Sequence, residues 1–232
     1  MNLMIGILSF LAFVSCILIT TLIIWKLKDR LIAKYILFGA CIYLMLRVML
    51  YPIIFSLFSI QVIWVKLLFD VLYLLICFIY VKKRIIQKIV KQDIQSNILI
   101  SFGFGEGLAE VIFLIFPSLL NYFLFFCIGF SNSLNNFFGS VYSEEEISSF
   151  LSIFNELPAT YFIYMSIAIF SLMIFQIIGT IMLFKDYKIS IIMGLVFYSI
   201  YIILSFMNYG FALLAFIVFD FLIIKIIKRG LV

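Results

Sequence analysis

The sequence contains no histidine and little charge. Charged residues make up 12% of its 232 residues and hydrophobic residues 67%, whereas soluble domains carry about twice that share of charge. A chain of this composition does not form the polar surface of a soluble domain. We therefore expect a polytopic membrane protein whose surroundings are the lipid bilayer. The net charge of +5 is then a topology signal, and no nucleic-acid partner is expected.

The absence of histidine removes the usual general base and a common zinc ligand. The four cysteines stand singly in apolar runs, as small hydrophobic residues do, and their spacing indicates neither zinc nor a disulfide framework. The sequence has no P-loop, dinucleotide fingerprint or EF-hand loop. We expect neither a metal nor a cofactor.

The apolar runs predict an all-α, polytopic helical bundle that forms a single transmembrane domain over residues 1–232. Outside the second and third spans, every Lys and Arg lies in connectors on one side, which predicts an outer N-terminus and an inner C-terminus. The seven expected transmembrane helices are Leu3–Trp25, Ile32–Pro52, Ile60–Val81, Ser96–Phe116, Ala159–Phe184, Ile189–Met207 and Phe211–Ile227.

Residues 118–158 are expected to form an outer loop with short amphipathic helices. Its first part, Leu119–Phe130, is too short for a straight crossing, so we expect a re-entrant or interfacial helix there. The rest carries four glutamates and no base. Ser143 and Glu146 have the spacing of a capping box, which predicts a short helix on the outer surface.

The segment Ser101–Ile112 places two carboxylates in an otherwise apolar helix. Residues three and four apart share a helix face, so Gly103, Glu106, Gly107 and Glu110 form one stripe. Carboxylates inside the membrane indicate a functional site, and small residues let another backbone approach closely. The stripe predicts either a binding trough beside the acids or a tight helix contact that carries one protonated acid.

This segment resembles the signature helix of the YhfC family of predicted intramembrane proteases. The family pattern is G-x-G-H-G-x-x-E-A-I, and the chain reads G-F-G-E-G-L-A-E-V-I from Gly103. Glu110 falls on the glutamate of the family and Glu106 replaces its histidine. The resemblance implies a multi-pass protein of a bacterial plasma membrane, with Glu106 and Glu110 as the catalytic residues if the chain is active.

The resemblance extends over most of Leu68–Ile203. A paired-glutamate motif of the family, E-E-x-x-R, places Asp70 at its second glutamate and Tyr73 at its arginine. Two histidines of the family fall on Tyr164 and Tyr198. The resemblance therefore implies that these four residues join the glycines and glutamates at the binding site, while the family's histidines have been replaced.

Three functions remain open from the sequence. The first is a protease-like protein that no longer cuts and instead binds a hydrophobic peptide or a membrane-protein segment beside Glu106 and Glu110, in maturation, chaperoning or immunity. The second is an active glutamate-type protease in which the two acids share a proton. The third is a small-solute permease or the membrane subunit of a transporter. The missing histidines favour the first function.

The buried charges predict specific partners. Depth along the spans places Arg47, Lys66, Glu110 and Tyr164 at one level, because each helical residue advances about 1.5 Å. We expect Glu110 to pair with Arg47 or Lys66. We expect a neutral Glu106, deeper in the bilayer, to donate toward Tyr198 or a ligand.

Overall fold

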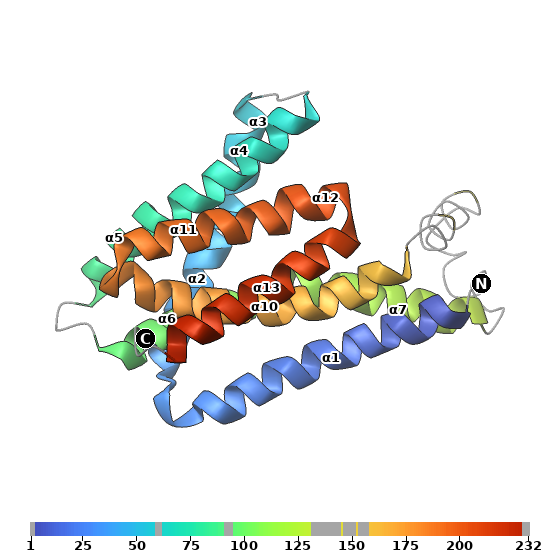
Figure 1. The fold of residues 1–232 in the computed structure, drawn as a ribbon, viewed down its shortest axis with the longest axis horizontal. Coiled ribbons are helices and arrows are strands. Elements are labelled where there is room, and N and C mark those ends of the chain that lie inside the picture. The colour runs from blue at the N-terminus through green and yellow to red at the C-terminus, as the bar shows by residue number, and fades with distance from the viewer. Residues whose placement is uncertain are drawn as a thin grey trace.

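The computed structural model describes residues 3–58, 62–90, 95–130, 145, 152 and 158–228. Over these residues the chain is an all-α bundle, and seven of its helical runs are long and apolar enough to cross a membrane. All seven expected spans are present. Figure 1 shows α1, α10, α11 and α13 extending roughly along the long axis of the molecule, while the span of α2 and α3 rises steeply and places α3 and α4 at the top, away from α1. Most of the predicted outer loop lies outside the described residues.

Several spans consist of α-helical pieces joined by π-helical segments. The first three spans are α1 (Leu3–Leu27) with the 3₁₀ turn η1 (Lys28–Arg30); α2 (Ala33–Tyr43), η2 (Leu44–Leu50) and α3 (Tyr51–Phe58); and α4 (Ile63–Ile76), η3 (Cys77–Val81) and α5 (Lys82–Ile89). The others are α6 (Ser96–Glu110), η4 (Val111–Ile115) and α7 (Phe116–Phe130); α10 (Ala159–Lys185); α11 (Tyr187–Tyr198), η5 (Ser199–Leu204) and α12 (Ser205–Met207); and α13 (Tyr209–Lys228).

Two spans form the centre of the bundle. In their most apolar windows, 82% of the residues of the span containing α6 are buried and 78% of those of α10, against 17% for the first span and 28% for α13. α6 packs against α2 and α10, and α10 also contacts α1, α11 and α13. The glutamate helix is therefore a core element with little exposure to lipid.

The fourth span is longer than expected, and its predicted end at Phe116, directly before Pro117, is wrong. The backbone stays helical from Ser96 to Phe130, and α7 packs along α1. A proline inside a helix lacks an N–H and crowds the carbonyl four residues earlier. The π-helical segment η4 ends at Ile115, two residues before Pro117, and the N–H of Phe116 bonds the Val111 carbonyl five residues back. Pro52 follows η2 in the same way, with Tyr51 bonding Leu46.

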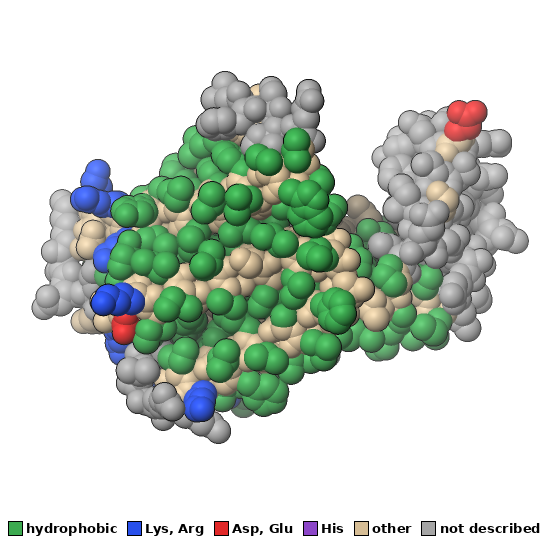
Figure 2. Space-filling model, turned by 45° about the horizontal axis from the view of Figure 1, so that its top comes forward, with side chains coloured by type: hydrophobic (Ala, Val, Ile, Leu, Met, Phe, Trp, Pro, Cys, Tyr) green, Lys and Arg blue, Asp and Glu red, His purple; other side chains and the backbone are tan. Residues whose placement is uncertain are grey.

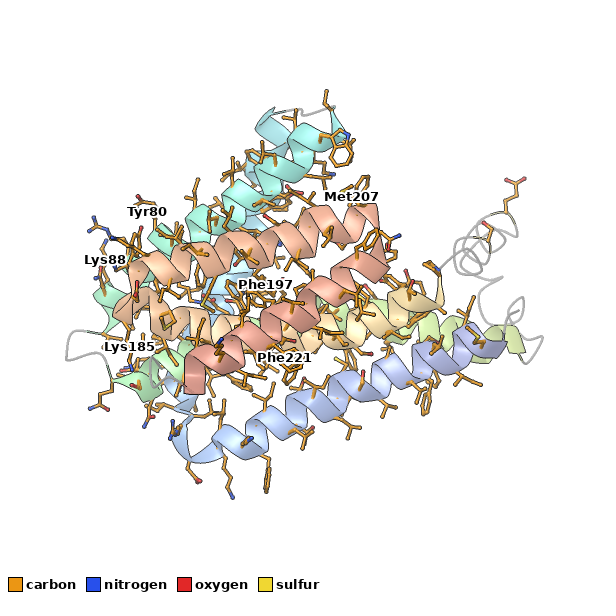
Figure 3. The ribbon with its side chains drawn as sticks, in the orientation of Figure 1. Tyr80, Lys88, Lys185, Phe197, Met207 and Phe221 are labelled. Atoms are coloured by element: carbon orange, nitrogen blue, oxygen red, sulfur yellow. The ribbon has the colours of Figure 1, made fainter. Side chains whose placement is uncertain are left out.

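Apart from Arg47 and Lys66, the basic side chains of the described residues lie at one end of the bundle. Figure 2 shows Lys and Arg at the left end of an otherwise apolar surface, and Figure 3 places Lys88 and Lys185 at that end and Met207 toward the other. Consecutive spans run in opposite directions through the bundle, so the connectors between them lie at alternate ends (Figure 1). This one-sided charge is the arrangement that the positive-inside rule requires. The inner location of that end stays a prediction.

Candidate functional site

A small polar cavity lies in the bundle where α2, α4, α6, α10 and α11 meet. Its volume is about 50 Å³, room for one or two water molecules. Its polar lining comes from several different spans, and its remaining wall is apolar. The residues that line it are Ile42, Tyr43, Leu46, Arg47, Tyr73, Leu74, Cys77, Phe78, Lys82, Glu106, Glu110, Gln176 and Tyr198.

Glu106 forms an ion pair with Lys82, the first residue of α5. The Lys82 side chain is 1% exposed and that of Glu106 8%. The Lys82 ammonium also donates to Oε1 of Gln176 at 3.3 Å and lies 4.8 Å from the centre of the Phe78 ring. Desolvating a charge is costly, and an oppositely charged partner with additional hydrogen bonds offsets that cost. The pair therefore holds α5, α6 and α10 together at the cavity.

Glu110 lies one turn further along α6 and is 5% exposed. It lines the same cavity as Arg47 of η2, although these two described side chains form no direct ion pair. The Arg47 guanidinium lies 4.9 Å from the centre of the Tyr51 ring. Arg47 and Lys82 together carry two positive charges when ionised, which balance the charges of Glu106 and Glu110. The cavity therefore contains a balanced set of four ionisable groups.

Two buried donors at the cavity have no partner within the described part of the chain. They are the Tyr43 hydroxyl and Nη1 of Arg47. Tyr43 precedes η2 and Arg47 lies within it, so both come from one wall of the cavity. Buried donors without acceptors are costly and call for an explanation. A ligand oxygen that entered the cavity would satisfy both.

π-helical segments adjoin the cavity in four spans. η2 contributes Arg47 and η3 contributes Cys77 and Phe78, while η4 begins directly after Glu110 and η5 directly after Tyr198. Pro52 and Pro117, which follow η2 and η4, explain those two segments, whereas no proline follows η3 or η5 within its span. Short π-helical segments rotate the residues that flank them and occur frequently at functional sites. Here they aim side chains from four spans at one point.

The glycines of the stripe make helix contacts and do not line the cavity. A Cβ atom on Gly103 would collide with the backbone of Gln176 and Ile177, and one on Gly107 would lie 3.0 Å from the Met173 sulfur. The trough expected beside the acids is therefore occupied by α10. Of the two sequence interpretations, the tight helix contact describes these glycines. This placement argues against Gly103 and Gly107 as ligand-binding residues.

The other predicted residues divide between the cavity and its surroundings. Tyr73 and Tyr198 line the cavity, and the Tyr73 hydroxyl donates to the Leu46 carbonyl at 2.5 Å. Asp70 lies outside it and accepts a hydrogen bond from Tyr51. Tyr164 lies away from the acids and stacks on Phe216, with ring centres 5.9 Å apart.

The expected charge partners need correction. Glu106 pairs with Lys82, and no hydrogen bond joins the two described residues Glu106 and Tyr198. Lys66 lies 4.9 Å from the Phe55 ring and does not reach the cavity. Of the two bases expected near Glu110, Arg47 is the one that lies there. Depth along a span gives the level of a residue but not the side of the helix on which it lies.

Sequence reasoning missed Lys82 and Gln176. Lys82 stands first in a run of three basic residues, a pattern that predicts an inner connector. In the structure its span continues to Ile89, and the Lys82 side chain points into the bundle. The helical spacing of Lys82, Ile86 and Ile89 on the inward side is the signal that marks it. Gln176 is the one amide side chain of the apolar helix α10 and belongs to no recognised motif, so the sequence offers no reason to select it.

The described residues contain no group of three or more cysteine, aspartate or glutamate side chains placed to hold a metal ion. Comparison of the sequence with protein-family models, with curated proteins and with solved structures gave no match. The cavity itself is therefore the basis for a functional proposal.

Proposed function

We propose that this chain is a membrane-embedded binding protein of the intramembrane-protease type that does not hydrolyse peptides. It holds a hydrophobic peptide or transmembrane segment of another protein, and one polar group of that segment enters the cavity beside Glu106 and Glu110. The observation that carries the proposal is the pair of unpartnered donors, Tyr43 Oη and Arg47 Nη1, at a cavity with apolar walls. The YhfC-like segment from Gly103 to Ile112 supports the same class of protein.

The pairing of Glu106 argues against the second function, an active glutamate protease. Activating water requires a base that is free to accept a proton. The acid at the position of the family's histidine is engaged by Lys82, and the chain has no histidine to replace it. Glu110 adjoins Arg47. A cavity of about 50 Å³ also gives little support to a solute pathway.

The unpartnered donors specify the group that the bound segment presents. A hydroxyl and a guanidinium N–H both donate, so the ligand group must accept. A carboxylate oxygen or a backbone carbonyl exposed at a helix break fits this requirement. Apolar positions around that group would then lie against Ile42, Leu46 and Leu74, which also line the cavity.

A binding assay with defined peptides tests this function. The purified protein in lipid nanodiscs is incubated with a Leu/Ala transmembrane peptide that carries one central Asp, and with the same peptide carrying Leu there. We expect the Asp peptide to be retained more tightly and to remain uncleaved by mass spectrometry. Equal retention of the two peptides would refute the binding role. A cleavage product lost in Glu110→Gln would instead establish the protease.

Two variants place that binding at the cavity. Tyr43→Phe removes one donor without altering the packing, and a hydrogen bond contributes about 0.5–1.5 kcal/mol, so retention of the Asp peptide should fall roughly two- to tenfold. Lys66→Gln is the matched control, because Lys66 lies on Phe55 outside the cavity. An unchanged affinity in Tyr43→Phe would place the peptide elsewhere.

A further inference from the structure

A second polar site lies on the far side of α10 from the glutamates, in a groove between α1 and α13. The groove has a volume of about 350 Å³, and α10 contributes its floor. In Figure 3 Phe221 lies between α13 and α1, at the edge of this groove. Its lining is apolar apart from one hydroxyl and one carboxyl, and consists of Ile19, Ser166, Ile167, Phe170, Ile217, Asp220, Phe221 and Ile224.

Asp220 is the unusual residue of this groove. One carboxylate oxygen accepts a hydrogen bond from the Ser171 hydroxyl at 2.8 Å. The other, Oδ1, is buried and has no partner within the described part of the chain, and the side chain belongs to a residue that is only 8% exposed. Asp220 forms no ion pair with any described residue. It differs in this from Glu106, which the chain supplies with its own cation.

The depth of Asp220 makes an unpaired carboxyl costly. It lies eleven residues after Tyr209, the first residue of α13, which is about 16 Å along the helix at 1.5 Å per residue. Ionisable groups near the middle of a membrane pair with another group and mark functional sites. The missing partner must reach this depth from outside the chain's own described helices.

The groove has one closed side and an exposed apolar rim. Ser15 of α1 donates to Ser166 of α10 with 2.9 Å between the hydroxyl oxygens, so these small side chains hold α1 close to α10 along one side of the groove. The rim is apolar, and Phe221 is 68% exposed. A helix lying in the groove would bury this apolar rim and bring one of its side chains to Asp220.

We propose that this groove binds a transmembrane helix of a partner protein that carries one Lys or Arg at the level of Asp220. Charge complementarity selects the base, because the described residues provide a carboxyl there and no cation. A second copy of the chain fits less well. Most of its described bases lie near the span ends that carry the basic connectors. The others are Arg47 and Lys82, which line the cavity, and Lys66, three residues from the start of α4 and so only about 5 Å along its helix.

Lipid alone does not satisfy the site either. An acyl chain would fill the apolar groove, but it has no donor for Asp220 Oδ1. A headgroup amine would have to leave the interface for the middle of the bilayer. A basic side chain on a helix reaches that depth at a fixed position and gains both the ion pair and the apolar contact.

The full chain in nanodiscs tests the proposal with Leu/Ala transmembrane peptides that carry a central Lys, Asp or Leu. We expect the Lys peptide to bind at least about tenfold more tightly than the Leu peptide, since close charge pairs contribute about 1.5 kcal/mol or more. Asp220→Asn keeps an acceptor for Ser171 and should abolish that preference. Asp70→Asn is the matched control, because Asp70 already has Tyr51 as its partner, and should preserve it.

Each other outcome contradicts the proposal. Equal binding of the Lys and Leu peptides would leave lipid as the occupant, and an unchanged preference in Asp220→Asn would place the Lys peptide elsewhere. A photoreactive phenylalanine analogue at position 221 that cross-links two copies of the chain would assign the groove to a dimer. The proposals for the cavity and for the groove can be refuted independently, because the Asp peptide and Tyr43→Phe report on the cavity alone.

Discussion

The cavity and the groove lie on two sides of α10 and treat buried charge in opposite ways. In the cavity, Glu106 has Lys82 as its partner and Glu110 lies near Arg47. In the groove, the described residues give Asp220 only a serine hydroxyl and no cation. The acids of the first site therefore have bases of the same chain beside them, whereas the carboxyl of the second is the one that we propose pairs with a partner's base. The comparison indicates which acid stabilises the fold and which is available to a partner.

The largest expected effect comes from removing the cation of the compensated site. Lys82→Met should lower the free energy of unfolding by about 3–5 kcal/mol, because it leaves Glu106 buried without its partner. Asp220→Asn should change it by less than about 1 kcal/mol, since the Ser171 hydrogen bond is kept. Chemical unfolding of the purified protein in detergent measures both. Equal losses in the two variants would end the distinction between the sites.

Lys83→Met is the control for that experiment. Lys83 is the next residue along α5 and lies 4.5 Å from the centre of the Tyr187 ring, with no buried acid to compensate. A cation–π contact at a partly exposed site contributes about 0.5–1 kcal/mol. A loss comparable to that of Lys82→Met would show that the basic run acts as a whole and that the pair with Glu106 is not special.

A second prediction concerns the helix contact that holds the cavity in place. Gly103→Ala puts a methyl group against the α10 backbone at Gln176 and should cost about 1–3 kcal/mol, because backbone cannot move aside as a side chain does. At Gly194 the added Cβ would lie 2.9 Å from the end of the Leu75 side chain, which is free to rotate. Gly194→Ala should therefore cost less in the same unfolding assay. The reverse order would contradict the close α6–α10 contact.

A third prediction separates Arg47 and Lys66, the two bases expected to pair with Glu110. Arg47→Gln and Glu110→Gln should be non-additive in unfolding free energy by about 1 kcal/mol, as expected for groups within one electrostatic network. Lys66→Gln combined with Glu110→Gln should be additive, because Lys66 lies on Phe55. Coupling of Glu110 to Lys66 instead would restore the pairing that depth alone suggested.

The smallest expected effect is at Asp70, the other carboxylate that the chain satisfies itself. Tyr51→Phe removes the hydroxyl that donates to Asp70 and should cost about 0.5–1.5 kcal/mol. Tyr73→Phe, which removes the bond to the Leu46 carbonyl, is a matched loss of one tyrosine hydroxyl inside the cavity. The thermal midpoints of both variants should fall by similar small amounts. A much larger fall in the thermal midpoint of either variant would show that its hydroxyl has further partners.

The sequence was sufficient for the spans but not for the side-chain partners. Apolar length and one-sided Lys and Arg predicted all seven helices, and the Glu106–Glu110 spacing located the buried acids. Pro117 misled the prediction of a helix end, because a π-helical turn before it lets the helix continue. Local patterns do not say how the spans that contain α5, α6 and α10 are rotated about their axes relative to one another. That rotation decides whether the Lys82 side chain points into the bundle.

The role of the glycine stripe shows the same limit. Gly103 and Gly107 indicate that something approaches the helix closely, and the sequence left both a ligand and a neighbouring helix possible. The contacts with Gln176 and Met173 identify the neighbour as α10. Gly39 of α2 makes a similar close contact on another face of α6, where an added Cβ atom would collide with the Phe102 carbonyl. Close contacts on both faces explain why α6 is so deeply buried.

A double-mutant cycle on Lys82 and Glu106 tests the central claim most directly, namely that Glu106 is committed to Lys82 and not to catalysis. Unfolding free energies are measured for the wild type, Lys82→Met, Glu106→Gln and the double variant. We predict a coupling of about 2 kcal/mol, with the double variant more stable than Lys82→Met, because no charge is then left buried alone. Additive losses would show that the two side chains do not interact, and Glu106 would again be free to act as a base.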